Sequence, residues 1–173
     1  MKPSYLVSGL PGHPLHPPLT DATIGTYTVA TALAVADVTG LSENAAAGGW
    51  WFALLFGLCL TVPTALTGLA DWLKITRGTP LWWTATWHMV VMVTATVFFA
   101  LAVVLGHDGW QGGDVDAGPF VLNVIGFLIL AVGGWLGGSI VFVHGMRVLN
   151  LVDEPTGRAV APVPHSEKEE AEA

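Results

Sequence analysis

Residues 50–69 read WWFALLFGLCLTVPTALTGL and contain no charged side chain. A helix needs roughly 20 mainly apolar residues to cross the hydrocarbon core of a bilayer, so this stretch predicts a transmembrane helix. Proline within it is tolerated in membrane helices and predicts a kink. Three other stretches of the chain are similarly apolar, and the four expected spans are 22–38, 48–69, 82–105 and 120–148. The sequence therefore predicts an all-α fold, an integral membrane four-helix bundle.

The composition of the whole chain agrees with this interpretation. Of the 173 residues, 53% are hydrophobic and only 11% are charged, whereas soluble domains carry about 25% charged residues. A chain so poor in charge cannot cover its exterior with polar groups, so we expect the lipid bilayer to surround it. The net charge is −7 and there is no basic patch, so no nucleic acid is expected as a partner. The single cysteine excludes an internal disulfide and any site that needs two thiolates.

Two polar segments flank the predicted bundle of residues 22–150. The N-terminal segment, 1–21, is rich in proline and histidine, and we expect its prolines to keep it out of a helix. It lacks the continuous apolar region of a cleavable signal peptide, so the first span is expected to direct insertion. The C-terminal segment, 151–173, is acidic and has no apolar face to bury. We expect this tail to be disordered.

The basic residues predict the orientation of the bundle. All of them would lie on one side of a four-span arrangement: Lys2, Lys74, Arg77, Arg147, Arg158 and Lys168. The loops on the other side carry only acidic side chains: Glu43, Asp108, Asp114 and Asp116. Cytoplasmic loops are enriched in Lys and Arg, so both termini are expected on the cytoplasmic side of a bacterial plasma membrane.

Histidines and aspartates are expected to gather at that same face. They are His13, His16, Asp21, Asp71, His88 and His144. Neutral imidazoles bind zinc, copper and iron, including haem iron, and helix bundles build cofactor sites from side chains on facing helices. We therefore expect His16, His88 and His144 to bind haem b or a divalent transition metal. For a metal ion, His13, Asp21 and Asp71 are further candidate ligands.

Each of these residues also has a simpler interpretation. The His88 imidazole is satisfied by a hydrogen bond to a threonine or a carbonyl, and His144 by water at the membrane interface. Asp21 suits the start of a helix, where it would cap free N–H groups. Asp71 falls at a helix C-terminus, where the dipole disfavours a carboxylate, so it needs a cation or a metal as partner. The nearest cation in sequence is Lys74.

Four motifs of the chain form a combination typical of one protein family. They are HPLHPPLTD at 13–21, LTGLADW at 66–72, TWHM at 86–89 and GGWLGGSIVFVHGMRV at 133–148. Together they resemble the bacterial domain-of-unknown-function family 2231, over about residues 12 to 150. The resemblance implies a four-span membrane protein without an established activity, and it makes the six histidines and aspartates signature or candidate positions.

Some relatives in that family carry an attached Rieske iron–sulfur domain, which implies a link to electron transfer. This chain has one cysteine and cannot hold a Rieske centre, which needs two cysteines and two histidines. The leading hypothesis is thus a membrane protein that binds haem or a metal, with a role in electron transfer and a redox partner.

Two alternatives stay open. The first is a non-enzymatic accessory subunit of a respiratory or transport complex. The second is an ion or proton pathway through Asp71 and His88. Self-association into a homo-oligomer is also open. An enzyme is the least supported class, because no nucleophile with a base partner and no phosphate-cradling loop is present.

Overall fold

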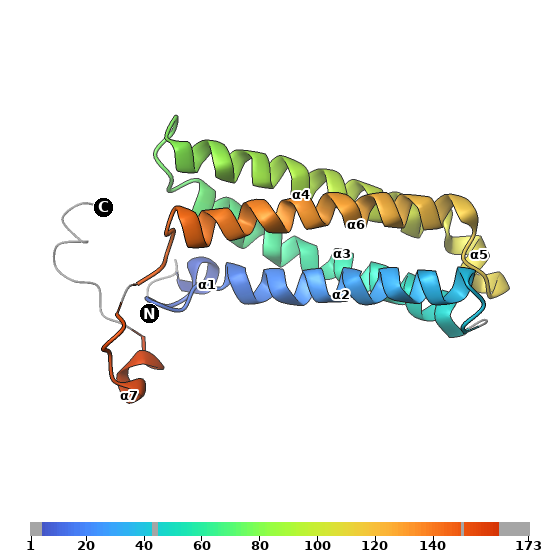
Figure 1. Ribbon diagram of the computed structural model, residues 1–173, viewed down its shortest axis with the longest axis horizontal. Helices are drawn as coiled ribbons and strands as arrows, with labels where there is room; N and C mark the ends of the chain where they lie inside the picture. Colours follow the sequence, from blue (N-terminus) through green and yellow to red (C-terminus); the bar gives the residue numbers. More distant parts are fainter. Residues whose placement is uncertain (1–4, 43–44, 150, 163–173) are drawn as a thin grey trace.

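The computed structural model describes residues 5–42, 45–149 and 151–162. Four long helices run side by side, each antiparallel to the one before it (Figure 1). Their bounds are α2 (His16–Val38), α3 (Ala45–Trp72), α4 (Pro80–Leu105) and α6 (Ala117–Gly138), the last continued by the π-helical turn η1 (Ser139–Val143). The predicted all-α bundle is confirmed.

Three of these helices are long and apolar enough to cross a membrane: α3, α4 and α6 with η1. The fourth, α2, has 23 residues and a length of about 35 Å at 1.5 Å per residue. It is less apolar than the others because threonines and two aspartates interrupt its sequence. The crossing of the membrane by α2 therefore stays a prediction.

Helix α2 begins earlier than the predicted first span. It starts at His16, with Pro17 and Pro18 in its first turn. The expectation that prolines keep this segment out of a helix was wrong. Proline has no backbone N–H to donate, but the first N–H groups of a helix have no intrahelical acceptor, so no hydrogen bond is lost in the first turn. The helix is preceded by Leu15, whose side chain makes no capping hydrogen bond. Asp21 lies in the second turn, so its expected capping role was also wrong.

The last long helix ends before its predicted limit. The amide of His144 donates to the carbonyl of Ser139 at 3.0 Å, which is the wider hydrogen-bond pattern of a π-helix. Gly145 and Arg147 then adopt positive φ angles of 68° and 60°. A left-handed residue ends a right-handed helix, so residues 144–148 leave the bundle instead of extending it.

The helices pack as two close pairs, α2 with α3 and α4 with α6. The ring of Tyr27 on α2 stacks on Phe99 of α4, with 3.9 Å between ring centroids, and so joins the pairs. A Cβ at Gly57 of α3 would lie 2.6 Å from the Tyr27 ring. Small residues of this kind let membrane helices approach closely, and here the glycine makes room for the central aromatic contact.

Several polar side chains in the interior are paired between helices. Asn123 is fully buried; its Oδ1 accepts from Trp50 Nε1 at 3.2 Å, and its Nδ2 donates to Thr31 at 2.9 Å. The hydroxyls of Thr23 and Thr64 lie 2.9 Å apart across the α2–α3 contact. In lipid every such group needs a protein partner, so these bonds fix which helix faces meet.

The two ends of the bundle differ in charge. The short helices α1 (Tyr5–Ser8) and α7 (Thr156–Ala159) lie at one end, and α5 (His107–Gly112) lies at the other (Figure 1). The α1 end carries the described basic residues, Lys74, Arg77, Arg147 and Arg158. The α5 end carries Asp108, Asp114 and Asp116.

The predicted disordered tail is only partly described. Residues 151–162 include α7, which buries no residue. The rest of the tail, 163–173, lies outside the described residues.

Candidate functional site

The candidate histidines and Asp71 all lie at the α1 end of the bundle, where α2 and α4 begin and α3 and η1 end (Figure 1). The sequence predicted this gathering from the alternating direction of the spans. What it did not predict is how each side chain is held.

His16 is the first residue of α2 and is half-buried against α3. A Cβ at Gly68 would lie 2.7 Å from the imidazole, so the ring occupies a notch that only glycine leaves open. Its Nδ1 lies 3.0 Å from the carbonyl of Thr64 and 3.2 Å from the hydroxyl of Thr67. A carbonyl can only accept, so Nδ1 carries the proton. In the described part of the chain, Nε2 has no hydrogen-bond partner.

His88 repeats this arrangement on the other helix pair. It lies in the third turn of α4, half-buried against α6, where its ring packs over Gly137. Its Nδ1 is 2.9 Å from the carbonyl of Gly133 and therefore donates to it. The simpler interpretation, a hydrogen bond to a carbonyl, is what the structure shows. As at His16, Nε2 has no partner among the described residues.

His16 and His88 lie at the same end of the bundle but on different helix pairs. His16 contacts α3 and His88 contacts α6, each through its Nδ1.

His144 follows η1 and is exposed. Its Nε2 lies 3.0 Å from the hydroxyl of Thr84, whose own proton is donated to the carbonyl of Pro80. Nε2 is therefore the donor, which leaves Nδ1 of His144 as the basic nitrogen. Thr84 is one helical turn before His88 on the same face of α4. The hydroxyl that His144 contacts is therefore one turn away from His88.

The three histidines do not form a complete metal-ligand set. Across residues 5–42, 45–149 and 151–162, no three His, Cys, Asp or Glu side chains are grouped closely enough to hold a metal ion. The predicted cofactor-binding residues thus share one end of the bundle without forming such a group.

Asp71 is buried at the C-terminal end of α3 and is neutralised by two cations. Its Oδ1 lies 2.8 Å from Nη1 of Arg147 and 3.7 Å from Nζ of Lys74. The expectation that Asp71 needs a cation is confirmed, but the closer partner is not the one nearest in sequence. Arg147 also donates to the carbonyl of Ser8 at 2.7 Å, and Lys74 to its hydroxyl. We call these four residues the Asp71 cluster; it ties α1, α3 and the segment after η1 together.

His13 and Asp21 stand apart from this site. His13 is exposed, and its Nδ1 lies 3.3 Å from the nearby carbonyl of Pro11. Asp21 is exposed on the outer flank of α2. Their roles as metal ligands stay predictions.

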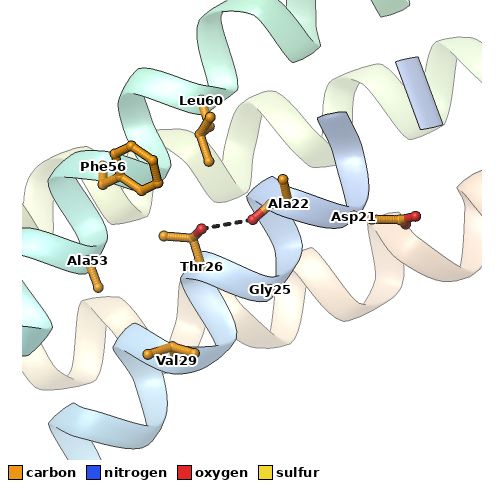
Figure 2. A pocket seen from close by; sticks show the side chains of 8 residues that line it. All are labelled: Asp21, Ala22, Gly25, Thr26, Val29, Ala53, Phe56 and Leu60. Carbon is orange, nitrogen blue, oxygen red and sulfur yellow. Dashed lines mark hydrogen bonds between the residues drawn. The ribbon is translucent and has the colours of Figure 1, made fainter. Parts of the chain in front are cut away.

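A shallow groove of about 550 Å³ lies on that outer flank, between α2 and α3 (Figure 2). Its lining residues are Asp21, Ala22, Gly25, Thr26, Val29, Ala53, Phe56 and Leu60. The one hydroxyl among them, that of Thr26, donates to the carbonyl of Ala22 at 2.8 Å. The groove is therefore apolar except at the end where Asp21 lies.

A protein-family model described as "Predicted membrane protein (DUF2231)" matches residues 12–150 of the chain. No curated protein and no solved structure matches the chain.

Proposed function

The chain belongs to the DUF2231 family of predicted membrane proteins, and we propose that this multi-pass protein binds a redox cofactor between its two helix pairs, through Nε2 of His16 and Nε2 of His88. One observation carries the proposal. Both imidazoles donate Nδ1–H to a backbone carbonyl of the facing helix and keep Nε2 unpartnered among the described residues. Histidines that ligate metals are usually oriented in this way.

A donor set of two imidazoles suits haem better than a free ion. The porphyrin supplies four nitrogen ligands, so the iron needs only two from the protein. A divalent transition metal would need further ligands, for which His144 is the nearest candidate, after release from Thr84. Bound haem would supply reversible one-electron transfer, which accords with a role in electron transfer.

The surrounding residues support such a role by holding the rings and setting the charge. The carbonyls of Thr64 and Gly133 fix the tautomer of each imidazole and make its Nε2 more basic. The glycines beneath the rings, Gly68 and Gly137, keep both imidazoles close to the helix surfaces. Asp71 adds negative charge near His16. The two cations of the Asp71 cluster, Arg147 and Lys74, partly neutralise that charge.

The same proposal places the site near the cytoplasm. The α1 end carries the described basic residues, and positive charge is enriched on the cytoplasmic side of membrane proteins. Both termini would then be cytoplasmic, in a bacterial plasma membrane. A redox partner would reach the cofactor from that side.

Absorption spectra with elemental analysis test the proposal. Protein purified from cells supplied with haem should show a Soret band, or a stoichiometric transition metal if the cofactor is an ion. The variants His16→Ala and His88→Ala should each lose it, whereas His107→Ala, at the other end of the bundle, should retain it. A folded wild-type protein that is colourless and free of metal would contradict the proposal and favour the accessory-subunit alternative.

A further inference from the structure

We propose that the groove between α2 and α3 binds one acyl chain of a phospholipid whose primary ammonium headgroup pairs with Asp21. This inference is independent of the cofactor, because the groove lies on the outer flank of the bundle and shares no residue with the histidine site.

The groove lies at the depth of the hydrocarbon core. Its α3 wall is formed by Ala53, Phe56 and Leu60, which belong to the middle of a helix long and apolar enough to cross the membrane. On α2 the groove runs from Ala22 to Val29, about 10 Å at 1.5 Å per residue. One leaflet contributes about 15 Å of hydrocarbon, so the groove is short enough to lie within a single leaflet.

The shape of the groove suits a flexible chain. The residues that line the groove are small at Ala22 and Gly25 of α2 and at Ala53 of α3, beside the larger Phe56 and Leu60 of α3 (Figure 2). No atom would lie within 4 Å of a Cβ placed on Gly25, so the space above this residue is open. An acyl chain fills such a space without leaving any polar group unpaired.

Asp21 selects the headgroup. It is exposed at the end of the groove and directly precedes the predicted first span, where the headgroup region begins. Among the described residues, no basic side chain lies within 4.0 Å of its carboxylate. The ammonium of phosphatidylethanolamine supplies both a positive charge and three hydrogen-bond donors, whereas choline has no N–H and phosphatidylglycerol is anionic.

Native mass spectrometry of the full chain, after exchange into mixed phosphatidylethanolamine, phosphatidylcholine and phosphatidylglycerol vesicles, tests the proposal. Wild-type protein should retain about fivefold more phosphatidylethanolamine than either of the other lipids. This factor is the size expected from the attraction of one charged group at a membrane surface. Asp21→Asn should retain as much lipid in total but lose the preference. Gly25→Leu fills the groove without a clash and should lower the amount of bound lipid.

The matched control is Gly134→Leu, which adds the same bulk to an open position of α6, outside the groove. It should bind lipid as the wild type does. The proposal is overturned if Asp21→Asn keeps the headgroup preference, or if Gly25→Leu retains as much lipid as Gly134→Leu. It is also overturned if Gly25→Leu converts a dimer to a monomer without changing bound lipid, because the groove would then hold a second copy of the chain.

Discussion

Replacing Arg147 by glutamine should destabilise the protein by about 2 kcal/mol. The side chain of Asp71 is only 8% exposed and that of Arg147 is 29% exposed. Removing one partner of a buried ion pair costs about 3–5 kcal/mol, because the other charge is left uncompensated. The smaller figure of about 2 kcal/mol applies here because Arg147 is partly exposed and Lys74 remains 3.7 Å from Asp71.

Reversible unfolding in mixed micelles would measure this loss. The matched control is Arg158→Gln, which removes a cation 2.9 Å from Glu154 but 76% exposed, so its cost should be about 0.5 kcal/mol or less. Adding Asp71→Asn to Arg147→Gln should recover part of the stability, since the unpaired charge is then gone. Equal effects of the two arginine substitutions would refute the argument that burial of Asp71 sets the strength of this contact.

Three further predictions follow from particular contacts. Asn123→Ala should lower the free energy of unfolding by about 1–3 kcal/mol, measured in the same micelles, because it removes two interhelical hydrogen bonds; an unchanged stability would contradict their role. Gly9→Ala should speed hydrogen exchange in residues 5–15 with the four long helices unaffected, since Gly9 has φ 80° and a Cβ there would lie 2.3 Å from the His13 carbonyl; unchanged exchange would count against this backbone constraint. Cys59, exposed on the middle of α3, should resist a charged maleimide in intact membranes, because the reagent stays in water and hydrocarbon disfavours the reactive thiolate. Ser42→Cys in the Cys59→Ser background should react; labelling of Cys59 by the charged reagent would place it in water.

The helices that the sequence predicts best are those whose ends are marked by local chemistry. α4 begins at Pro80, directly after Thr79, whose hydroxyl accepts from the amide of Trp82, and it ends where Gly106 follows. Apolar length and flanking glycine or proline are enough to find such a helix. The predicted start of α2 was wrong because proline disfavours a helix interior but is compatible with a first turn.

The site could be predicted only as a gathering of residues at one end. The alternating direction of the spans places His16 and His88 at the same end of the bundle, and a hydrophobicity pattern carries that much information. It carries none about which carbonyl each ring meets, because those contacts depend on how far Gly68 and Gly137 let the helices approach. The partner of Asp71 was missed for a similar reason. Arg147 reaches it only because the chain turns back after η1 through residues with positive φ.

The electron paramagnetic resonance spectrum of the oxidised, haem-loaded protein tests the pairing of His16 and His88 most directly. Two imidazole ligands should give a low-spin ferric signal in the wild type. That signal should become high-spin in His16→Ala and in His88→Ala, and stay low-spin in His107→Ala. A wild-type protein that binds no haem, or a low-spin signal that survives both substitutions, would contradict the account.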